Sequence, residues 1–230
     1  MSLRAVNHYG KYPILLVILV IGFLAWPRQK IVVKGSSMAP GLLPGDTLLM
    51  KKMFSPAVAH SLPELQIARG DVVVFRYPSR GGELYVKRII GLPGDSIRIV
   101  KGRVYVNGSV LVEPYLNQGI KAFDDYGYNF PQWPARPVSA RAVEMLTRYV
   151  RDNQLVIPDG NWFVLGDNRN NSFDSRDLGF IPSADIVGVP SRVAWSIDPN
   201  ACSSGPKNAG GCIWNALRWS RLLRPIQNSH

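Results

Sequence analysis

Residues 35–46, with the sequence GSSMAPGLLPGD, restrict the backbone more than any other part of this chain. Pro40 and Pro44 each fix one backbone torsion, while the three glycines allow torsions that other residues resist. A loop built in this way can hold a small side chain, such as that of Ser37, in one exposed orientation. An ordinary turn between two strands is the alternative, because Gly and Pro are also common turn residues. The stretch predicts a constrained loop with Ser37 as a candidate functional residue.

Short apolar runs that favour β structure recur along the chain, separated by turns rich in Gly and Pro. The 21 glycines and 18 prolines show no repeat period, which suits a turn-rich β protein better than a helical one. Asn107-Gly108 lies between two such runs and predicts a type I′ hairpin turn. We therefore expect a mainly β fold of antiparallel sheets. The expected strands and hairpin cover residues 30–33, 47–50, 72–75, 83–90, 104–112, 162–165, 186–189 and 192–195.

Residues 113–159 break this pattern and are expected to form a subdomain inserted into the β core. Within them, residues 139–150 predict a short helix, with Ser139 as its N-terminal cap. The apolar positions at helical spacing are Ala142, Val143, Leu146 and Val150.

Residues 12–26 are uncharged and almost wholly apolar. This run is short against the ~20 residues of a spanning helix, so a cleaved signal peptide is an alternative. Tyr12 and Trp26 at its ends suit the aromatic belts of a membrane segment. We therefore expect residues 1–30 to form a tail and one transmembrane helix, followed by a β-rich domain over residues 31–230. Basic residues flank the run on both sides, so charge alone does not set its orientation.

The formal net charge of +11 favours anionic partners, either nucleic acid or an anionic membrane surface. The sequence contains no zinc-ligand cluster, helix-turn-helix pattern or basic-aromatic RNA motif, which argues against nucleic acid. The apolar N-terminal run favours a lipid bilayer instead. Neither a metal site nor a cofactor is expected, because the two cysteines have no other metal-ligating residues nearby.

Residues 85–95 (YVKRIIGLPGD) and 166–176 (GDNRNNSFDSR) follow residues 35–46 along the chain. Together the three stretches resemble, in family order, the signature boxes of the type I (leader) signal peptidase family. The resemblance implies a catalytic domain of antiparallel β-sheets anchored in the inner (cytoplasmic) membrane by one N-terminal helix. It places the N-terminus inside and the catalytic domain on the outer (periplasmic) face. It also implies a serine endopeptidase that removes N-terminal signal peptides from exported preproteins.

The resemblance assigns Ser37 as the nucleophile, Lys87 as the general base and Ser172 as the residue that orients the lysine. The chain's three histidines are His8, His60 and His230. None of them lies in a recognisable motif, so a serine nucleophile here needs another base. A lysine accepts a proton only when it is neutral, so burial must lower its pKa from about 10.4.

Some family members carry a serine two residues before the nucleophile, where this chain has Gly35. The oxyanion hole is then expected to rest on backbone N–H groups, chiefly that of Ser37. The hydroxyl of Ser36 is a second candidate donor. Shallow apolar pockets for the small residues that end signal peptides are implied by the resemblance, and plain core packing is the alternative for the residues concerned. The matching residues are Met38, Leu42, Leu48, Tyr85 and Val86.

Neighbouring side chains of a strand point to opposite faces, so Lys87 and Arg88 cannot both face the serine. If Lys87 faces the site, Arg88 faces away and needs an anion. Asp167 and Asp174 are the candidates implied by the resemblance. Asp174 also matches a structural ion pair with Arg176, so neither member of that pair is expected to be catalytic.

Other functions fit parts of the pattern. The inserted subdomain allows a specialised family member with one dedicated substrate, such as a pilin precursor. A self-cleaving repressor with related Ser/Lys chemistry is disfavoured by the apolar N-terminal run and the lack of a DNA-binding domain. An inactive membrane-tethered binding module is disfavoured because Ser37, Lys87 and Ser172 all occur in matching contexts.

Cys202 and Cys212 bracket a loop rich in Gly and Ser, and we predict that they form a disulfide bond in an oxidising compartment. Closing this loop is expected to stabilise the fold by roughly 2–3 kcal/mol. Thiol labelling of the native, oxidised protein should modify neither cysteine, and labelling after reduction should modify both. Modification of both cysteines before reduction would show two free thiols instead.

Overall fold

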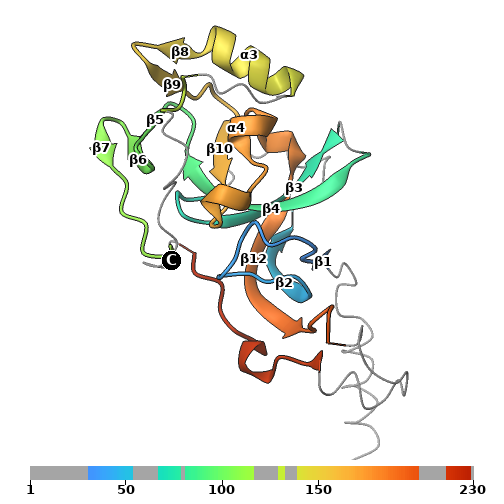
Figure 1. Ribbon diagram of the computed structural model, residues 1–230. Coiled ribbons are helices and arrows are strands. Elements are labelled where there is room, and N and C mark those ends of the chain that lie inside the picture. Colours follow the sequence, from blue (N-terminus) through green and yellow to red (C-terminus); the bar gives the residue numbers. More distant parts are fainter. Residues whose placement is uncertain are drawn as a thin grey trace, which may run out of the picture. The chain divides into compact units, whose positions relative to one another are not determined.

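The computed structural model describes residues 31–53, 67–78, 81–116, 129–132, 139–201 and 216–228 (Figure 1). Residues 31–230 form one compact unit. The expected membrane anchor in residues 1–30 and the expected Cys202–Cys212 disulfide lie outside the described residues. Within the described ranges, no helix is long and apolar enough to cross a membrane.

The larger sheet has seven strands in the order β1-β2-β12-β3-β4-β10-β11. All of its pairs are antiparallel, which confirms the expected fold class. Its strands are β1 (Ile31–Val32), β2 (Asp46–Met53), β3 (Val72–Tyr77), β4 (Glu83–Gly91), β10 (Asn161–Leu165), β11 (Ile181–Pro182) and β12 (Ile186–Ser196).

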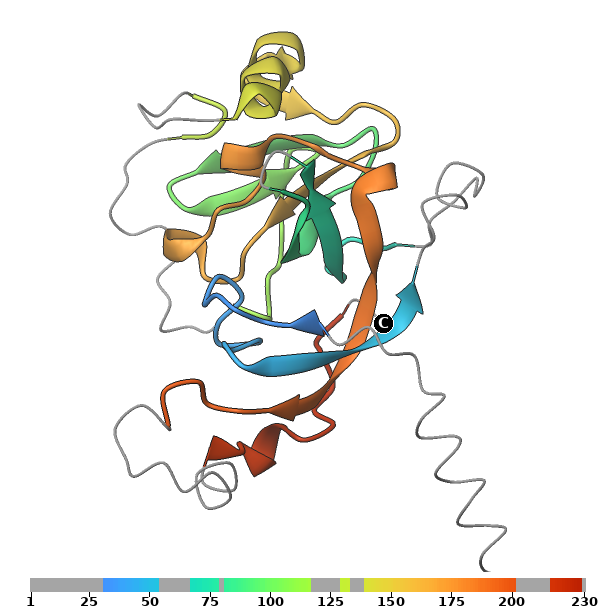
Figure 2. The ribbon, with the colours of Figure 1, turned by 90° about the vertical axis from the view of Figure 1, so that its right-hand side faces the viewer.

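β12 joins two runs that the sequence presented as separate strands, residues 186–189 and 192–195. It pairs with β3 at one end and with β2 along most of its length, and its register with β2 shifts on both sides of Pro190. Bulges of this kind bend a strand and accommodate a proline that cannot donate to the ladder. The bend is visible where β12 leaves β3 and follows β2 (Figure 2).

The smaller sheet has five strands in the order β7-β6-β5-β9-β8. Asn107 and Gly108 connect β6 to β7 with φ angles of 51° and 81°, which confirms the predicted hairpin turn, since type I′ requires positive φ at both positions. β5, β8 and β9 were not expected, although SIRIV in β5 alternates as a half-buried strand does. The strands are β5 (Ser96–Val100), β6 (Arg103–Val106), β7 (Ser109–Val110), β8 (Val150–Arg151) and β9 (Gln154–Val156).

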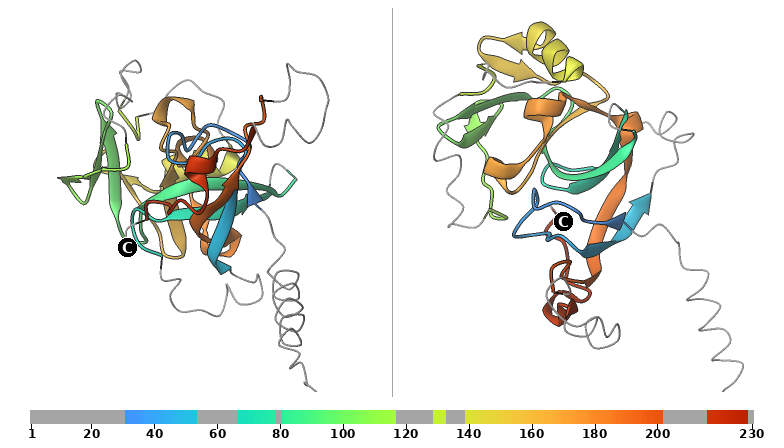
Figure 3. Two further views of the ribbon diagram at one scale, coloured as in Figure 1. Left: turned by 90° about the horizontal axis from the view of Figure 1, so that it is seen from below. Right: turned by 45° about the vertical axis from the view of Figure 1, so that its right-hand side comes forward.

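The predicted helix is present as α3 (Ala140–Arg148), and the Ser139 side chain caps it by accepting from the Ala142 backbone N–H at 3.1 Å. Its buried face agrees with the expected one at Ala142, which is fully buried, and at Leu146, which packs against the core, but Val143 is 41% exposed and Met145 is buried instead. Val150, expected in the helix, begins β8 instead. The element α3 lies with β8 and β9 at one end of the described unit, away from β2 (Figure 1 and Figure 3).

β4 connects two apolar cores because its neighbouring residues Ile89 and Ile90 point to opposite faces, and both are fully buried. Ile90 packs with Ile97 and Phe163 toward the smaller sheet, and Ile89 packs with Phe75 on the other side. A strand held on both faces in this way has little freedom to shift. β4 is therefore a rigid support for Lys87, which lies two residues earlier.

Candidate active site

The loop between β1 and β2 carries Ser37 and is closed at its base by two backbone hydrogen bonds between Val33 and residues 45 and 46, both 2.8 Å long. Met38 and Leu42 are 1% and 2% exposed and pack into the core beneath the loop. A 2.8 Å bond from the Leu42 N–H to the Met38 carbonyl joins these two anchors. Because Met38 and Leu42 anchor the loop in the core, the half-exposed Ser37 side chain has a defined position.

Two asparagines that the sequence analysis did not single out hold the loop from its other side. Asn168 donates its backbone N–H to the Ser37 carbonyl at 3.0 Å and its side-chain amide to the Ser36 carbonyl at 3.2 Å. Asn171 donates to the Ser36 hydroxyl at 3.1 Å. Asn171 lies in the 3₁₀ helix η3 (Arg169–Asn171), with Asn168 directly before it. Their place inside the third stretch, residues 166–176, was the only sequence signal for this role.

Lys87 extends from β4 toward the loop, and its Nζ lies 2.7 Å from Ser37 Oγ. The same nitrogen lies 3.0 Å from the carbonyl oxygen of Val86. Lys87 is only 3% exposed, and this burial lowers its pKa from 10.5 to about 8 against the opposing effects of Asp174 and Asp167. The amine is therefore partly neutral near physiological pH, which allows it to accept a proton.

Ser172 lies beside this pair, next to Gly166. A β-carbon added to Gly166 would lie 2.2 Å from Ser172 Oγ and 2.5 Å from the Ser37 carbonyl oxygen, so only glycine fits between them. Ser172 Oγ is buried and close enough to Asp174 to help lower the pKa of that carboxyl, and among the described residues it makes no hydrogen bond to Lys87. The assignment of Ser172 as the group that orients Lys87 therefore stays a prediction.

Arg88 points to the opposite face of β4 from Lys87. Its guanidinium binds Asp167 through two hydrogen bonds of 2.7 and 2.8 Å, so of the two expected anions the structure shows Asp167. Asp174 is paired with Arg176 at 2.8 Å. Although full burial alone would raise the Asp174 pKa, Arg176 and the Gly166 N–H hold that pKa below its usual value. Both carboxylates beside Lys87 therefore carry an arginine partner.

A further buried network joins the start of the expected insertion to the third stretch. Glu113 binds the guanidinium of Arg169, which is 1% exposed, and also accepts a 2.8 Å hydrogen bond from the Tyr115 hydroxyl. The Tyr115 ring covers the Arg88 guanidinium at 3.9 Å, and burial raises the pKa of its hydroxyl. The sequence analysis missed this network, because it placed Glu113 in a region with no clear pattern.

The five expected substrate-contact residues separate into two groups. Met38, Leu42 and Leu48 are at most 3% exposed and belong to the core, where they support the site from beneath. Tyr85 and Val86 are partly exposed on β4, and the Tyr85 ring lies 5.6 Å from Lys87 Nζ. Of the five, only these two are partly exposed, and their contact with substrate stays a prediction.

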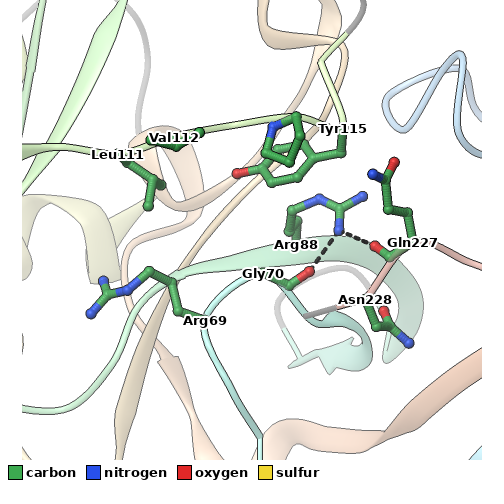
Figure 4. A pocket seen from close by; sticks show the side chains of 9 residues that line it. Arg69, Gly70, Arg88, Leu111, Val112, Tyr115, Gln227 and Asn228 are labelled. Atoms are coloured by element: carbon green, nitrogen blue, oxygen red, sulfur yellow. Dashed lines mark hydrogen bonds between the residues drawn. The ribbon is translucent and has the colours of Figure 1, made fainter. Parts of the chain in front are cut away.

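A cavity of about 210 Å³ lies on the Arg88 side of β4 and includes neither Ser37 nor Lys87 (Figure 4). The Arg88 guanidinium faces it and donates to the carbonyl oxygens of Gly70 at 2.6 Å and Gln227 at 2.5 Å. This cavity is separate from the Ser37–Lys87 pair. Its lining residues are Arg69, Gly70, Arg88, Leu111, Val112, Pro114, Tyr115, Gln227 and Asn228.

An antiparallel β fold that holds a serine hydroxyl against a buried lysine amine has the parts of a serine peptidase that works without histidine. The family model described as signal peptidase, peptidase S26, matches residues 6–195 of the chain. The chain therefore belongs to the signal peptidase family, and it is a serine peptidase of that family.

Two sequence relatives agree with this assignment, those from Pseudomonas aeruginosa and Bacillus caldolyticus. Signal peptidase I of Pseudomonas aeruginosa is 36% identical over 202 residues, which cover 78% of this chain and 69% of that protein. Signal peptidase I of Bacillus caldolyticus is 38% identical over 157 residues, covering 68% of this chain and 74% of that protein. A solved signal peptidase I from Enterococcus faecalis V583 is 33% identical and covers 54% of this chain and 96% of its own, with a TM-score of 0.37.

Proposed function

We propose that this chain is a membrane-anchored endopeptidase that removes N-terminal signal peptides from exported preproteins, with Ser37 as nucleophile and Lys87 as general base. The observation that carries the proposal is the 2.7 Å contact between Ser37 Oγ and the Nζ of a lysine that is 3% exposed. Residues 1–30 would supply a single membrane helix, and the catalytic domain would face the outer side of the inner membrane. The relatives named signal peptidase I support the substrate class.

The chemistry starts from the neutral Lys87 amine. As Ser37 Oγ attacks the carbonyl carbon of the scissile bond, its proton moves to Nζ, and the carbonyl oxygen becomes an oxyanion. The resulting ammonium returns that proton to the departing amine when the C–N bond breaks, which leaves an acyl ester on Ser37. Lys87 then takes a proton from a water molecule that attacks the ester carbonyl. It returns this proton to Ser37 Oγ as the ester C–O bond breaks, which releases the acid product and frees Ser37.

The surroundings of Nζ favour this sequence. The Val86 carbonyl, 3.0 Å away, accepts an N–H of the neutral amine and directs the lone pair toward Ser37. It also accepts from the ammonium that forms during the reaction. The buried Ser172 hydroxyl lies next to Gly166 and the Ser37 carbonyl, where it would restrict the amine once substrate excludes water.

The Ser37 N–H is the main candidate for the oxyanion hole, because it has no acceptor among the described residues. Gly35 offers no side chain for this purpose, and a β-carbon added there would meet nothing within 4 Å. The Ser36 hydroxyl accepts a 3.1 Å hydrogen bond from the Asn171 side chain, which fixes its oxygen but leaves its proton free, so Ser36 stays a second candidate donor. Removing one donor from such a hole costs roughly 3–4 kcal/mol of transition-state stabilisation.

We expect Ser37→Ala to abolish cleavage of a panel of purified preproteins without unfolding the protein, because alanine removes only the attacking oxygen. Ser36→Ala is the matched control and loses one neutral hydrogen bond, so its rate should fall only a few-fold, by about 1 kcal/mol. N-terminal sequencing of the products would identify the cleaved bond. Equal residual activity in the two variants would show that Ser37 is not the nucleophile.

We expect the cleavage rate to rise with pH and to reach half of its maximum near the Lys87 pKa of about 8. Below that pH Nζ is protonated and cannot accept the serine proton, whereas above it the neutral base predominates. Lys87→Arg and Lys87→Ala should both lose roughly a thousandfold or more, because a guanidinium stays charged even when buried.

The exposed Lys101 supplies the control, and Lys101→Arg should keep the rate and the pH profile of the unaltered protein. Substantial activity in Lys87→Arg would mean that position 87 acts by its positive charge and not as a base.

A further inference from the structure

The C-terminal segment, residues 216–228, runs beside β12 and continues past the cavity of Figure 4. The Val193 N–H of β12 donates to the Arg224 carbonyl, and the Ile226 N–H donates to the Ser191 carbonyl, both at 2.8 Å. The C-terminal segment includes the 3₁₀ helix η5 (Trp219–Arg221), drawn in red near β12 and β2 (Figure 1).

One side chain of the segment reaches the loop that carries Ser37. Arg221, 5% exposed, binds both carboxylate oxygens of Asp46, which is fully buried at the start of β2. The same guanidinium donates to the Gly41 carbonyl at 2.8 Å. Asp46 in turn accepts the Leu43 N–H at 2.8 Å. A single guanidinium thus joins the middle of the loop to its end.

A second arginine of the segment holds the loop between these two points. Arg218 donates to the Pro44 carbonyl at 2.9 Å and to the Ser196 hydroxyl at 3.2 Å. It also pairs with Asp198 at 3.1 Å, but it is more exposed than Arg221, with 24% of its side chain accessible. Arg221 therefore holds the Ser37 loop more strongly than Arg218 does, since a buried charge-assisted hydrogen bond is screened less by water.

The same segment also reaches the strand that carries Lys87, from behind. The Gln227 carbonyl accepts from Arg88, the residue next to Lys87, as the dashed line in Figure 4 shows. The Asn228 side chain accepts the Val72 N–H at 2.9 Å, on the strand paired with β4. The segment thus contacts both of the elements whose spacing sets the distance from Ser37 to Lys87.

We propose that Arg221 is a positioning residue for the peptidase reaction, which holds the Ser37 loop at the distance from Lys87 that proton transfer requires. This inference rests on the proposed roles of Ser37 and Lys87. Misplacing a reacting group by about 1 Å can lower the rate about 100-fold. A residue that fixes the Ser37 loop can therefore affect the cleavage rate without touching the substrate. Arg221 itself touches neither Ser37 nor Lys87 in the described structure.

The test compares Arg221→Lys and Arg221→Met in the full chain, with kcat and KM measured on a preprotein substrate. Lysine keeps the charge beside Asp46, but its single ammonium cannot hold the carboxylate and the Gly41 carbonyl together. We expect kcat to fall about tenfold in Arg221→Lys and more in Arg221→Met, with KM changed less than twofold. The pH midpoint is expected to rise above about 8, because a displaced loop admits water to the Lys87 amine, whose burial is the main cause of its lowered pKa.

Loss of stability has to be separated from loss of position, because Arg221→Met leaves the buried Asp46 charge without its partner. The double variant Asp46→Asn/Arg221→Met removes both charges and is expected to regain the melting temperature without regaining kcat. Arg141→Met is the control, since Arg141 of α3 forms a 2.7 Å ion pair away from the loop, with Asp185 of the 3₁₀ helix η4 (Ser183–Asp185). It should leave kcat unchanged whatever its effect on stability.

Hydrogen exchange of peptides covering residues 35–46 supplies a readout that needs no substrate. The Leu42, Gly45 and Asp46 amides are hydrogen-bonded within the loop, and they should exchange faster in both Arg221 variants but not in Arg141→Met. Unchanged kcat in both Arg221 variants, or full kcat in the double variant, would overturn the proposal. An inactive unaltered protein, or activity retained in Ser37→Ala, would instead refute the proposed function.

Discussion

The exclusion of water from one lysine amine is the condition on which the rest of the site depends. Lys87 is a useful base only while its pKa stays near 8, and burial between the Ser37 loop and β4 is the main cause of that value. β4 is suited to the task because its next residues, Ile89 and Ile90, fill separate cores on its two faces. The amine is therefore fixed by a strand that the whole domain holds in place.

The negative charges around the amine are controlled by arginines. Asp167 and Asp174 both raise the Lys87 pKa, and an unpaired carboxylate at either position would favour the ammonium. Arg88 binds the first and Arg176 the second, which keeps each carboxylate satisfied without a contact to Nζ. Burying these pairs is expected to contribute little net stability, since desolvation offsets most of the attraction. These two ion pairs instead hold residues 166–176 against the Ser37 loop, and they limit how far the carboxylates raise the Lys87 pKa.

Much of this arrangement was visible in the sequence, because it depends on local rules. The two-residue period of a strand required Lys87 and Arg88 to face opposite ways, and Asn107-Gly108 marked its own turn. The contacts missed were those between distant segments. Arg221 and Asp46 are 175 positions apart in the sequence, and Arg169 and Glu113 are 56 positions apart. Contacts between such distant residues produce no periodic pattern in the sequence.

Part of the buried face of α3 was mispredicted for a related reason, although Ala142 is buried as expected. Helical spacing does not say which of two apolar stripes meets the core, and packing selected Met145 over Val143.

The most direct test of the buried base is a titration of the Lys87 amine by NMR in protein labelled at lysine with a stable isotope. The Lys87 signal would be assigned by its absence from the Lys87→Arg variant. A midpoint near 8 is the predicted result, with the other lysines titrating near their ordinary value of about 10.4. A midpoint for Lys87 that coincides with the exposed lysines would contradict the claim, because the amine would then be almost wholly protonated at the pH at which the peptidase works.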